Sequence, residues 1–266
     1  PGAVVYPIGT PGVPLSRREL RKKMSHNPFF EWLDNYNLRD VTFFKDDFDN
    51  VALNTTNDWN VSVGAGATTW AVLAGGENGL LRGVHGGTAA TSGLQLSRPA
   101  TLTGDRFCGM ECYFQTSNVT AKRIEIGFVD VVTAVNTTIV NNLTTPTFNA
   151  GPGDAAVYVF DNTAATNTMG LYCLNSDGAT AAKAAFTAQL PVISTFVHVR
   201  VEVKTDSAWL WVNGQQVASI TGVGAAGAIE GGTKLLPIFN AKSGDTNTGN
   251  IDIDYVHVYA DRVTQA

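Results

Sequence analysis

The carboxylates Glu125 and Asp130 come nearest, by residue type and spacing, to supporting catalysis. Paired carboxylates cleave glycosidic bonds when one attacks the sugar or activates water and the other protonates the leaving oxygen, at a separation of about 5–5.5 Å or about 6.5–9.5 Å. Positions five apart on a regular strand face opposite sides of a sheet, so this pair needs a bulge. We therefore expect Glu125 to be an ordinary strand residue and the chain to have no catalytic residues.

Trp209 and Trp211 lie two positions apart, so on a strand they share one face and can stack on a sugar ring. Packing in the core is the interpretation we favour for both. The four histidines are scattered without metal-ligand spacing.

The three cysteines do not form a disulfide framework. Cys108 and Cys112 fall in a strand-like run, where a separation of four residues places their Cα atoms about 13 Å apart. A disulfide requires about 7 Å or less. Either of them can instead pair with Cys173, but we expect three buried free thiols.

The composition is apolar enough for a large core and unusually low in charge. Hydrophobic residues make up 44% of the chain and charged residues 15%, against about 25% charged in an average globular protein. No apolar run approaches about 18 residues, so we expect no membrane span. The first residues lack the pattern of a signal peptide, so we expect synthesis in the cytoplasm unless a leader was removed before Pro1.

Charge is unevenly distributed along the chain. Residues 1–45 hold seven Lys and Arg against four Asp and Glu, a balance of +3, whereas residues 46–266 hold 11 against 19, a balance of −8. Prolines and glycines in residues 1–15 predict an extended segment. Ser16 and Glu19 form a capping box for a short helix over 17–24, and Asn27 with Pro28 begins a second helix. The sequence thus predicts an N-terminal arm over residues 1–40.

The arm has two surfaces suited to partner binding. Its first helix carries a basic cluster of Arg17, Arg18, Arg21, Lys22 and Lys23, and its second carries an apolar face of Phe29, Trp32, Leu33 and Tyr36. Contact with an acidic protein surface, a solvated helix face and nucleic acid are the three alternatives for the basic cluster. We favour the protein contact and expect no nucleic acid, because five basic residues without interleaved aromatics give modest affinity.

From residue 41 onward the apolar pattern has a period of two. Val197, Val199, Val201 and Val203 alternate with polar or large residues, and Asn213-Gly214 marks a hairpin between Ala208–Val212 and Gln215–Ile220. Many short strands with Gly, Asn and Asp punctuation predict an all-β antiparallel two-sheet sandwich over residues 41–266. The other predicted strands are Thr42–Phe44, Trp59–Val63, Leu94–Leu96, Arg106–Phe114, Arg123–Val129, Ala156–Phe160, Gly170–Leu174, Leu235–Asn240 and Ile251–Tyr259.

Both ends of this body resemble a known family. The run Phe44–Asn50 followed by Leu53 and Trp59 is similar to the opening strand of family-16 glycoside hydrolases and related concanavalin A-like lectin/glucanase domains. The run Ile253–Tyr259 resembles their closing strand. The resemblance implies a jelly-roll sandwich over about residues 42–260.

The resemblance also implies an active site that this chain lacks. The family carries E-x-D-x-x-E on a central strand, whereas residues 125–130 read Glu-Ile-Gly-Phe-Val-Asp, with Gly127 in place of the middle aspartate and a shortened final acid. Family members often hold a structural calcium ion, which Asp254 and Asp47 match in position. We favour turn and edge-strand hydrogen bonding for these two and expect no cofactor.

A non-enzymatic jelly roll on an extended arm suggests a structural protein of a tailed-bacteriophage virion. Its amino-acid composition resembles that of capsid decoration or cement proteins and head fibres. Such a protein would be made in the host cytoplasm and would lie on the outer surface of the particle. The arm would bind a capsid or other virion protein, and the chain would be a homo-oligomer. The first alternative is a carbohydrate-binding module or tail appendage whose concave sheet holds a host glycan at Trp209 or Trp211. The second is a degenerate glycoside hydrolase.

Overall fold

The computed structural model describes residues 41–49, 52–73, 79–85, 92–99, 102–149, 151–162, 168–176, 180–186, 191–222, 228–244 and 248–261. In these ranges the regular structure is β-strand, and none of it is a helix long and apolar enough to cross a membrane. The predicted arm, residues 1–40 with its two helices, lies outside the described residues. Its separation from the sandwich therefore stays a prediction.

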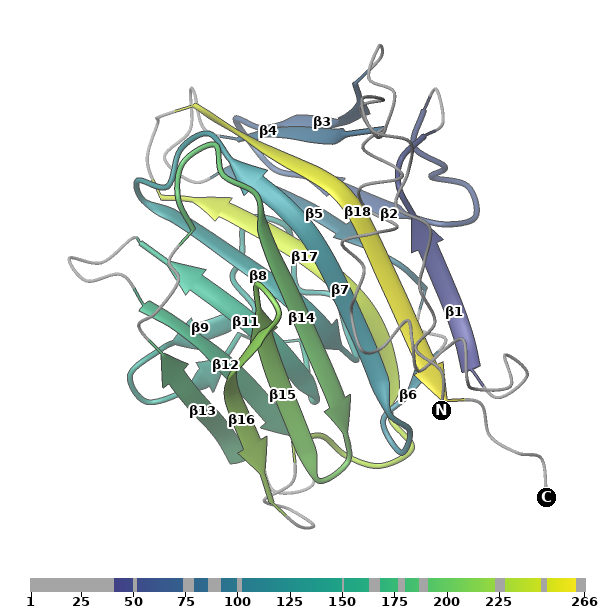
Figure 1. The fold of residues 1–266 in the computed structure, drawn as a ribbon. Helices are drawn as coiled ribbons and strands as arrows, with labels where there is room; N and C mark the ends of the chain where they lie inside the picture. The colour runs from purple at the N-terminus through teal and green to yellow at the C-terminus, as the bar shows by residue number, and fades with distance from the viewer. Residues whose placement is uncertain are drawn as a thin grey trace, which may run out of the picture. The chain divides into compact units, whose positions relative to one another are not determined.

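The described strands form two eight-stranded antiparallel sheets and a small hairpin (Figure 1). Sheet A has the order β16 (Gln215–Thr221), β15 (Ser207–Val212), β14 (Val197–Lys204), β7 (Cys108–Thr116), β18 (Gly249–Asp261), β4 (Leu81–His85) and β3 (Thr68–Val72), and β1 (Val41–Asp46) also pairs with β18. Sheet B has the order β13 (Thr180–Phe186), β12 (Thr168–Asn175), β11 (Ala155–Asp161), β8 (Lys122–Val129), β17 (Lys234–Ser243), β5 (Ser92–Ser97) and β2 (Asn60–Val63), with β6 (Leu102–Thr103) on β17. The hairpin joins β9 (Val140–Asn142) and β10 (Thr147–Phe148).

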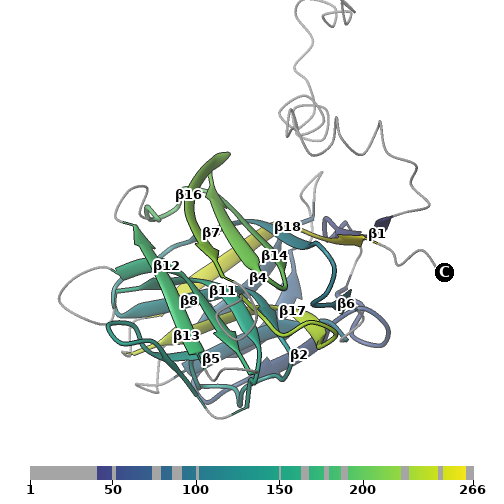
Figure 2. The ribbon, with the colours of Figure 1, turned by 90° about the horizontal axis from the view of Figure 1, so that it is seen from below.

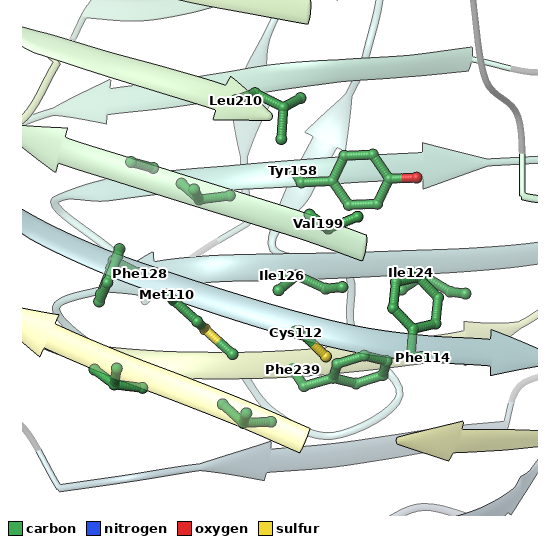
Figure 3. Close-up of a cluster of buried hydrophobic side chains, with 14 of the residues drawn as sticks. Met110, Cys112, Phe114, Ile124, Ile126, Phe128, Tyr158, Val199, Leu210 and Phe239 are labelled. Carbon is green, nitrogen blue, oxygen red and sulfur yellow. The ribbon is translucent and has the colours of Figure 1, made fainter. Parts of the chain in front are cut away.

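The two sheets stack as layers, with the core between them (Figure 2). Alternate residues of the strands point inward, as period-two alternation requires. Met110, Cys112 and Phe114 of sheet A meet Ile124, Ile126, Phe128, Tyr158 and Phe239 of sheet B (Figure 3). The three cysteines are buried and free, which confirms the predicted thiols. Burial raises the pKa of the Cys108 thiol to about 12.

The predicted all-β, two-sheet antiparallel sandwich is confirmed, and so is the meander β14–β15–β16. Its hairpin turns on Asn213 and Gly214, both with positive φ (49° and 79°), as a two-residue turn of this type requires. The opening and closing strands pair with each other, Phe44 opposite Val258. Six strands were not predicted: β3, β4, the alanine-rich β13 and the short β6, β9 and β10.

Candidate functional site

Glu125 occupies the middle of β8, the central strand of sheet B. Its neighbours Ile124 and Ile126 enter the core between the sheets, so alternation directs Glu125 to the outer face of sheet B. A carboxylate on an outer face is normally hydrated. Here it is 0% exposed, because another part of the chain covers it.

The Glu125 carboxylate is fully engaged in a structural network. It accepts hydrogen bonds from the backbone amides of Ile139 (2.6 Å) and Val140 (3.0 Å) and from Asn240 Nδ2 (2.8 Å). Arg123 Nε lies 3.2 Å from it, and the same guanidinium pairs with Asp161 at 3.0 Å. Buried charges persist when they are paired and hydrogen-bonded in this way.

The cover is residues 131–149, which we call the strap. It connects β8 to β11 and includes β9 and β10. Three residues that lie side by side on neighbouring strands of sheet B bind the strap. Glu125 of β8 lies opposite Asn240 of β17, and Asn240 lies opposite Gln95 of β5. Asn240 donates to the Thr137 carbonyl (3.2 Å) and Gln95 to the Thr133 carbonyl (3.3 Å). Three neighbouring strands therefore bind one strap through its backbone.

The strap also has its own small apolar core. Ile139 and Val140 are fully buried against outer-face residues of sheet B, namely Val129, Ala155, Val157, Val159, Tyr172, Leu236 and Ile238. At the other side of the strap, Asn136 lies so close to Gly64 and Gly93 that an added Cβ would approach its side chain to 1.7 Å and 2.8 Å. The strap is thus an integral layer of the protein.

Glu125 and Asp130 are not arranged as a catalytic pair. β8 keeps an unbroken register with both neighbours from Lys122 to Val129, so it contains no bulge. Asp130 follows the strand and accepts the Gly153 amide at 3.0 Å. Gly127 has φ +150°, and a Cβ there would lie 2.2 Å from the carbonyl oxygen of Ala156. No aspartate fits at the position where the family's motif has one.

Trp209 and Trp211 lie on the other sheet from Glu125. They share one face of β15, as predicted, but that face is the outer side of sheet A and both are half-buried. The favoured interpretation of core packing is therefore wrong, because the core residues of β15 are Ala208, Leu210 and Val212. Trp211 Nε1 donates to Glu202 (2.9 Å), and the Arg200 guanidinium covers its ring at 4.4 Å. The sugar-stacking prediction for both stays untested.

A second cluster of polar side chains lies on the same face of sheet A, with Glu111 at its centre. It lies 2.8 Å from His198 Nε2 and accepts the Tyr255 hydroxyl at 2.9 Å. Burial raises its pKa, but the hydrogen bond and charge of His198 outweigh burial and hold the pKa at about 2. His257 stacks on Tyr255 at 4.5 Å. Burial lowers the His257 pKa to about 4, against the opposing attraction of Glu111.

These two groups predict an acid-sensitive stability. Below pH 6.5 the unfolded chain protonates His257 before the folded protein does, so stability falls by about 3 kcal/mol between pH 6.5 and pH 4. Glu111 stabilises the fold above its unfolded pKa of 4.5, and this contribution, also about 3 kcal/mol, is lost as pH falls to about 2. Urea unfolding at stepped pH measures both.

A His257→Gln variant should flatten the decline between pH 6.5 and pH 4 and leave most of the lower step in place, because His198 lowers the pKa of Glu111 more than His257 does. Asp206→Asn, at an exposed side chain, should leave both steps unchanged. A stability that is constant from pH 7 to about pH 4 in the native protein contradicts the assignment.

The described contacts of Asp47 and Asp254 leave the calcium prediction untested. Asp47 pairs with Lys45 at 3.1 Å, and the buried Asp254 sits at a bulge of β18 between Ile253 and Tyr255. Among the described residues, no group of three or more His, Cys, Asp or Glu side chains is placed to hold a metal. Nothing in this geometry favours calcium over hydrogen bonding, so we derive no role for it.

The predicted partner-binding residues Arg17, Arg18, Arg21, Lys22, Lys23, Phe29, Trp32, Leu33 and Tyr36 lie outside the described residues. The residues that sequence reasoning missed are Asn240, Gln95 and the strap itself. One signal points to the strap: predicted strands ending at Val129 and beginning at Ala156 leave a connection longer than ordinary loops of about 12–15 residues.

Comparison with known proteins shows the fold. No family profile and no curated protein matches this sequence. A protein of unknown function from Shewanella oneidensis has a similar structure, with a TM-score of 0.55 and 14% identity over 95% of this chain and 96% of the other. The Emp47p carbohydrate recognition domain is also similar, with a TM-score of 0.54 and 14% identity over 86% of this chain and 100% of that domain. A third similar structure is the catalytic domain of an endo-1,3-beta-glucanase (laminarinase) from Thermotoga petrophila. Its TM-score is 0.51, with 14% identity over 84% of this chain and 99% of that domain.

The chain therefore has the concanavalin A-like lectin/glucanase β-sandwich fold. This confirms the fold that the resemblance implied. Sugar-recognition domains and glucanases share it, so the fold alone does not assign a function.

Proposed function

We propose that the chain is a non-enzymatic structural protein of an assembled particle, a virion decoration or head-fibre protein carried on its N-terminal segment. The observation that carries the proposal is the role of Glu125. The one glutamate that matches the family's catalytic strand binds the strap through Ile139 and Val140 and is 0% exposed. A nucleophile or acid must reach the bond that it cleaves, and this carboxylate reaches no substrate.

Two further features support a role in assembly over catalysis. The strap closes the outer face of sheet B with a buried apolar layer, so that side of the sandwich offers no open cleft at Glu125. The charge division between residues 1–45 (+3) and residues 46–266 (−8) suits an attachment segment and a projecting body with different surroundings. An arm that orders on binding can wrap a large partner surface.

The second candidate is a carbohydrate-binding module. It is favoured by the half-buried Trp209 and Trp211 on the outer face of sheet A, since exposed indole rings stack on sugars. It is weakened at Trp211, where Arg200 already covers one ring face and Glu202 takes the indole N–H. The indole N–H of Trp211 is thus committed within the protein, which leaves Trp209 as the better candidate for a sugar contact.

Sedimentation tests the proposed function. An antibody against the sandwich should detect the chain in the rapidly sedimenting particle fraction of a nuclease-treated lysate of its source, at a fixed stoichiometry to the major shell protein. Immunogold microscopy should place it on the outside of those particles. A purified sample should bind nothing on a glycan array.

Recovery of the chain only in slowly sedimenting fractions contradicts the assembly role. If the protein binds a glycan on the array, loses this binding in Trp209→Ala and does not label particles, the carbohydrate-binding role replaces the assembly role. As a control, Val131→Ala on the strap should leave array binding unchanged, because Val131 lies 48% exposed on the sheet B side.

A further inference from the structure

The outer face of sheet A differs in kind from the outer face of sheet B. Sheet B is covered by the strap, which belongs to the same chain. Sheet A instead presents aromatic and charged side chains from β7, β14, β15 and β18. This face is therefore the better candidate for contact with another molecule.

Aromatic rings extend across the width of this face. Phe196 stacks on Tyr113 at 4.8 Å, and Tyr113 stacks on Tyr255 at 5.7 Å. Trp209 and Trp211 continue the face on β15, and all five rings are half-buried. Four and three positions before Phe196, Val192 and Ile193 are exposed by 62% and 51%. Aromatic residues and Arg are enriched in the centres of protein interfaces.

Most charged side chains on this face and on the neighbouring strands β1 and β4 form pairs of opposite charge. Lys45 pairs with Asp47, Arg82 with Asp252, Arg200 with Glu202 and Lys204 with Asp206. Glu111 lies against His198 at 2.8 Å, and this contact neutralises the carboxylate only when the histidine is protonated. Residues 46–266 as a whole carry 11 basic against 19 acidic groups, so two copies repel through most of their surface. The outer face of sheet A is a place where they can approach without that repulsion.

The face can supply about two thirds of the area of a stable interface, and its side-chain relief and the neighbouring loops must supply the rest. Five strands, β16 to β18 in sheet order, span about 24 Å at about 4.8 Å spacing, and seven residues extend about 23 Å. The flat area is about 550 Å², before side-chain relief is added, and stable interfaces bury about 800 Å² per partner. An aromatic surface whose charges are mostly paired suits a second sheet packed face to face at about 10 Å.

We propose that the outer face of sheet A binds the same face of a second copy of this chain, so that the protein is an isologous dimer. The inference rests on the proposed function in one respect, because assembly proteins act as repeated copies. In such a dimer each contact occurs twice about a two-fold axis. Trp209, Phe196 and the Val192–Ile193 loop would then meet their counterparts near that axis or across it.

Sedimentation velocity on the purified full chain tests the interface. The native protein should be a dimer at about 10 µM and above. A Val192→Asp/Ile193→Asp double variant and a Trp209→Lys variant should each raise the dimer Kd at least about tenfold. The matched control is Val131→Asp, at an exposed valine of the strap, which should leave the Kd unchanged. If Trp209→Lys fails to fold, the double variant still decides, since both its residues are exposed.

A native protein that stays monomeric up to about 100 µM overturns the inference, and so does equal weakening by Val131→Asp. A photo-crosslinker at residue 193, in a mixture of isotope-labelled and unlabelled chains, should join position 193 to residues 192–211 of the other chain. Cross-links to residues 1–40 would assign the face to that segment and overturn the proposal. The assay uses no particle, so a monomer refutes the interface alone, and absence from particles refutes the proposed function alone.

Discussion

A Glu125→Ala variant is expected to unfold about 10 °C below the native protein. Removing one partner of a buried ion pair costs about 3–5 kcal/mol, and each kcal/mol shifts Tm by about 2–4 °C in a domain of this size. The loss leaves the Ile139 and Val140 amides without their acceptor and removes one of the two carboxylates that pair with Arg123. Calorimetry measures the change, and hydrogen exchange should show the amides of the strap exchanging faster.

Glu125→Gln should be destabilised as well, since its amide group would place N–H donors against N–H donors of the strap. The matched control is Asp206→Ala, which removes an acid from an exposed pair with Lys204 and should leave Tm almost unchanged. If Glu125→Ala has the native Tm and the native rate of hydrogen exchange in the strap, Glu125 does not hold the strap in place. A catalytic role for Glu125 would then have to be considered again.

Restoring the family's acid with Gly127→Asp should abolish folding and produce no glucanase. The residue has φ +150°, and its added Cβ would lie 2.2 Å from the Ala156 carbonyl oxygen and 3.0 Å from the Val157 Cα. Both atoms belong to β11, the paired neighbouring strand, so the clash cannot be relieved by a side-chain rotation. We expect insoluble protein or a lost cooperative transition, and no release of reducing sugar from β-1,3-glucan by native or variant protein.

Gly214→Ala is the matched control. Gly214 also has a positive φ, +79°, but nothing lies within 4 Å of its would-be Cβ. Only the left-handed strain of about 1–2 kcal/mol applies there, and the variant should fold with Tm lowered by about 4 °C. A soluble Gly127→Asp protein that melts near the native temperature, or that hydrolyses the glucan, would refute the close approach seen at β8 and β11.

Much of the sandwich follows from local pattern. Alternation along Val197–Lys204 assigns the inward and outward residues before any partner strand is known, because successive side chains point to opposite faces. Asn213-Gly214 similarly defines its hairpin, since few other residues adopt positive φ at both turn positions. Where the pattern is weak, prediction failed: β13 reads Thr-Ala-Ala-Lys-Ala-Ala-Phe, and alanine has little preference for strands.

The sequence by itself therefore determined the all-β class, the strands with strong alternation, the free thiols and the absence of the family's middle acid at Gly127. What covers each sheet was decided only by the tertiary structure. The contact between Glu125 and Asn240 joins residues 115 positions apart, and the strap reaches Glu125 from a loop that has no strand pattern of its own. The side chains of Glu125 and Trp209 both point away from the core, but the two residues lie on different sheets. Alternation gives each strand two faces, and only the packing of distant strands decides which face becomes buried, covered or free.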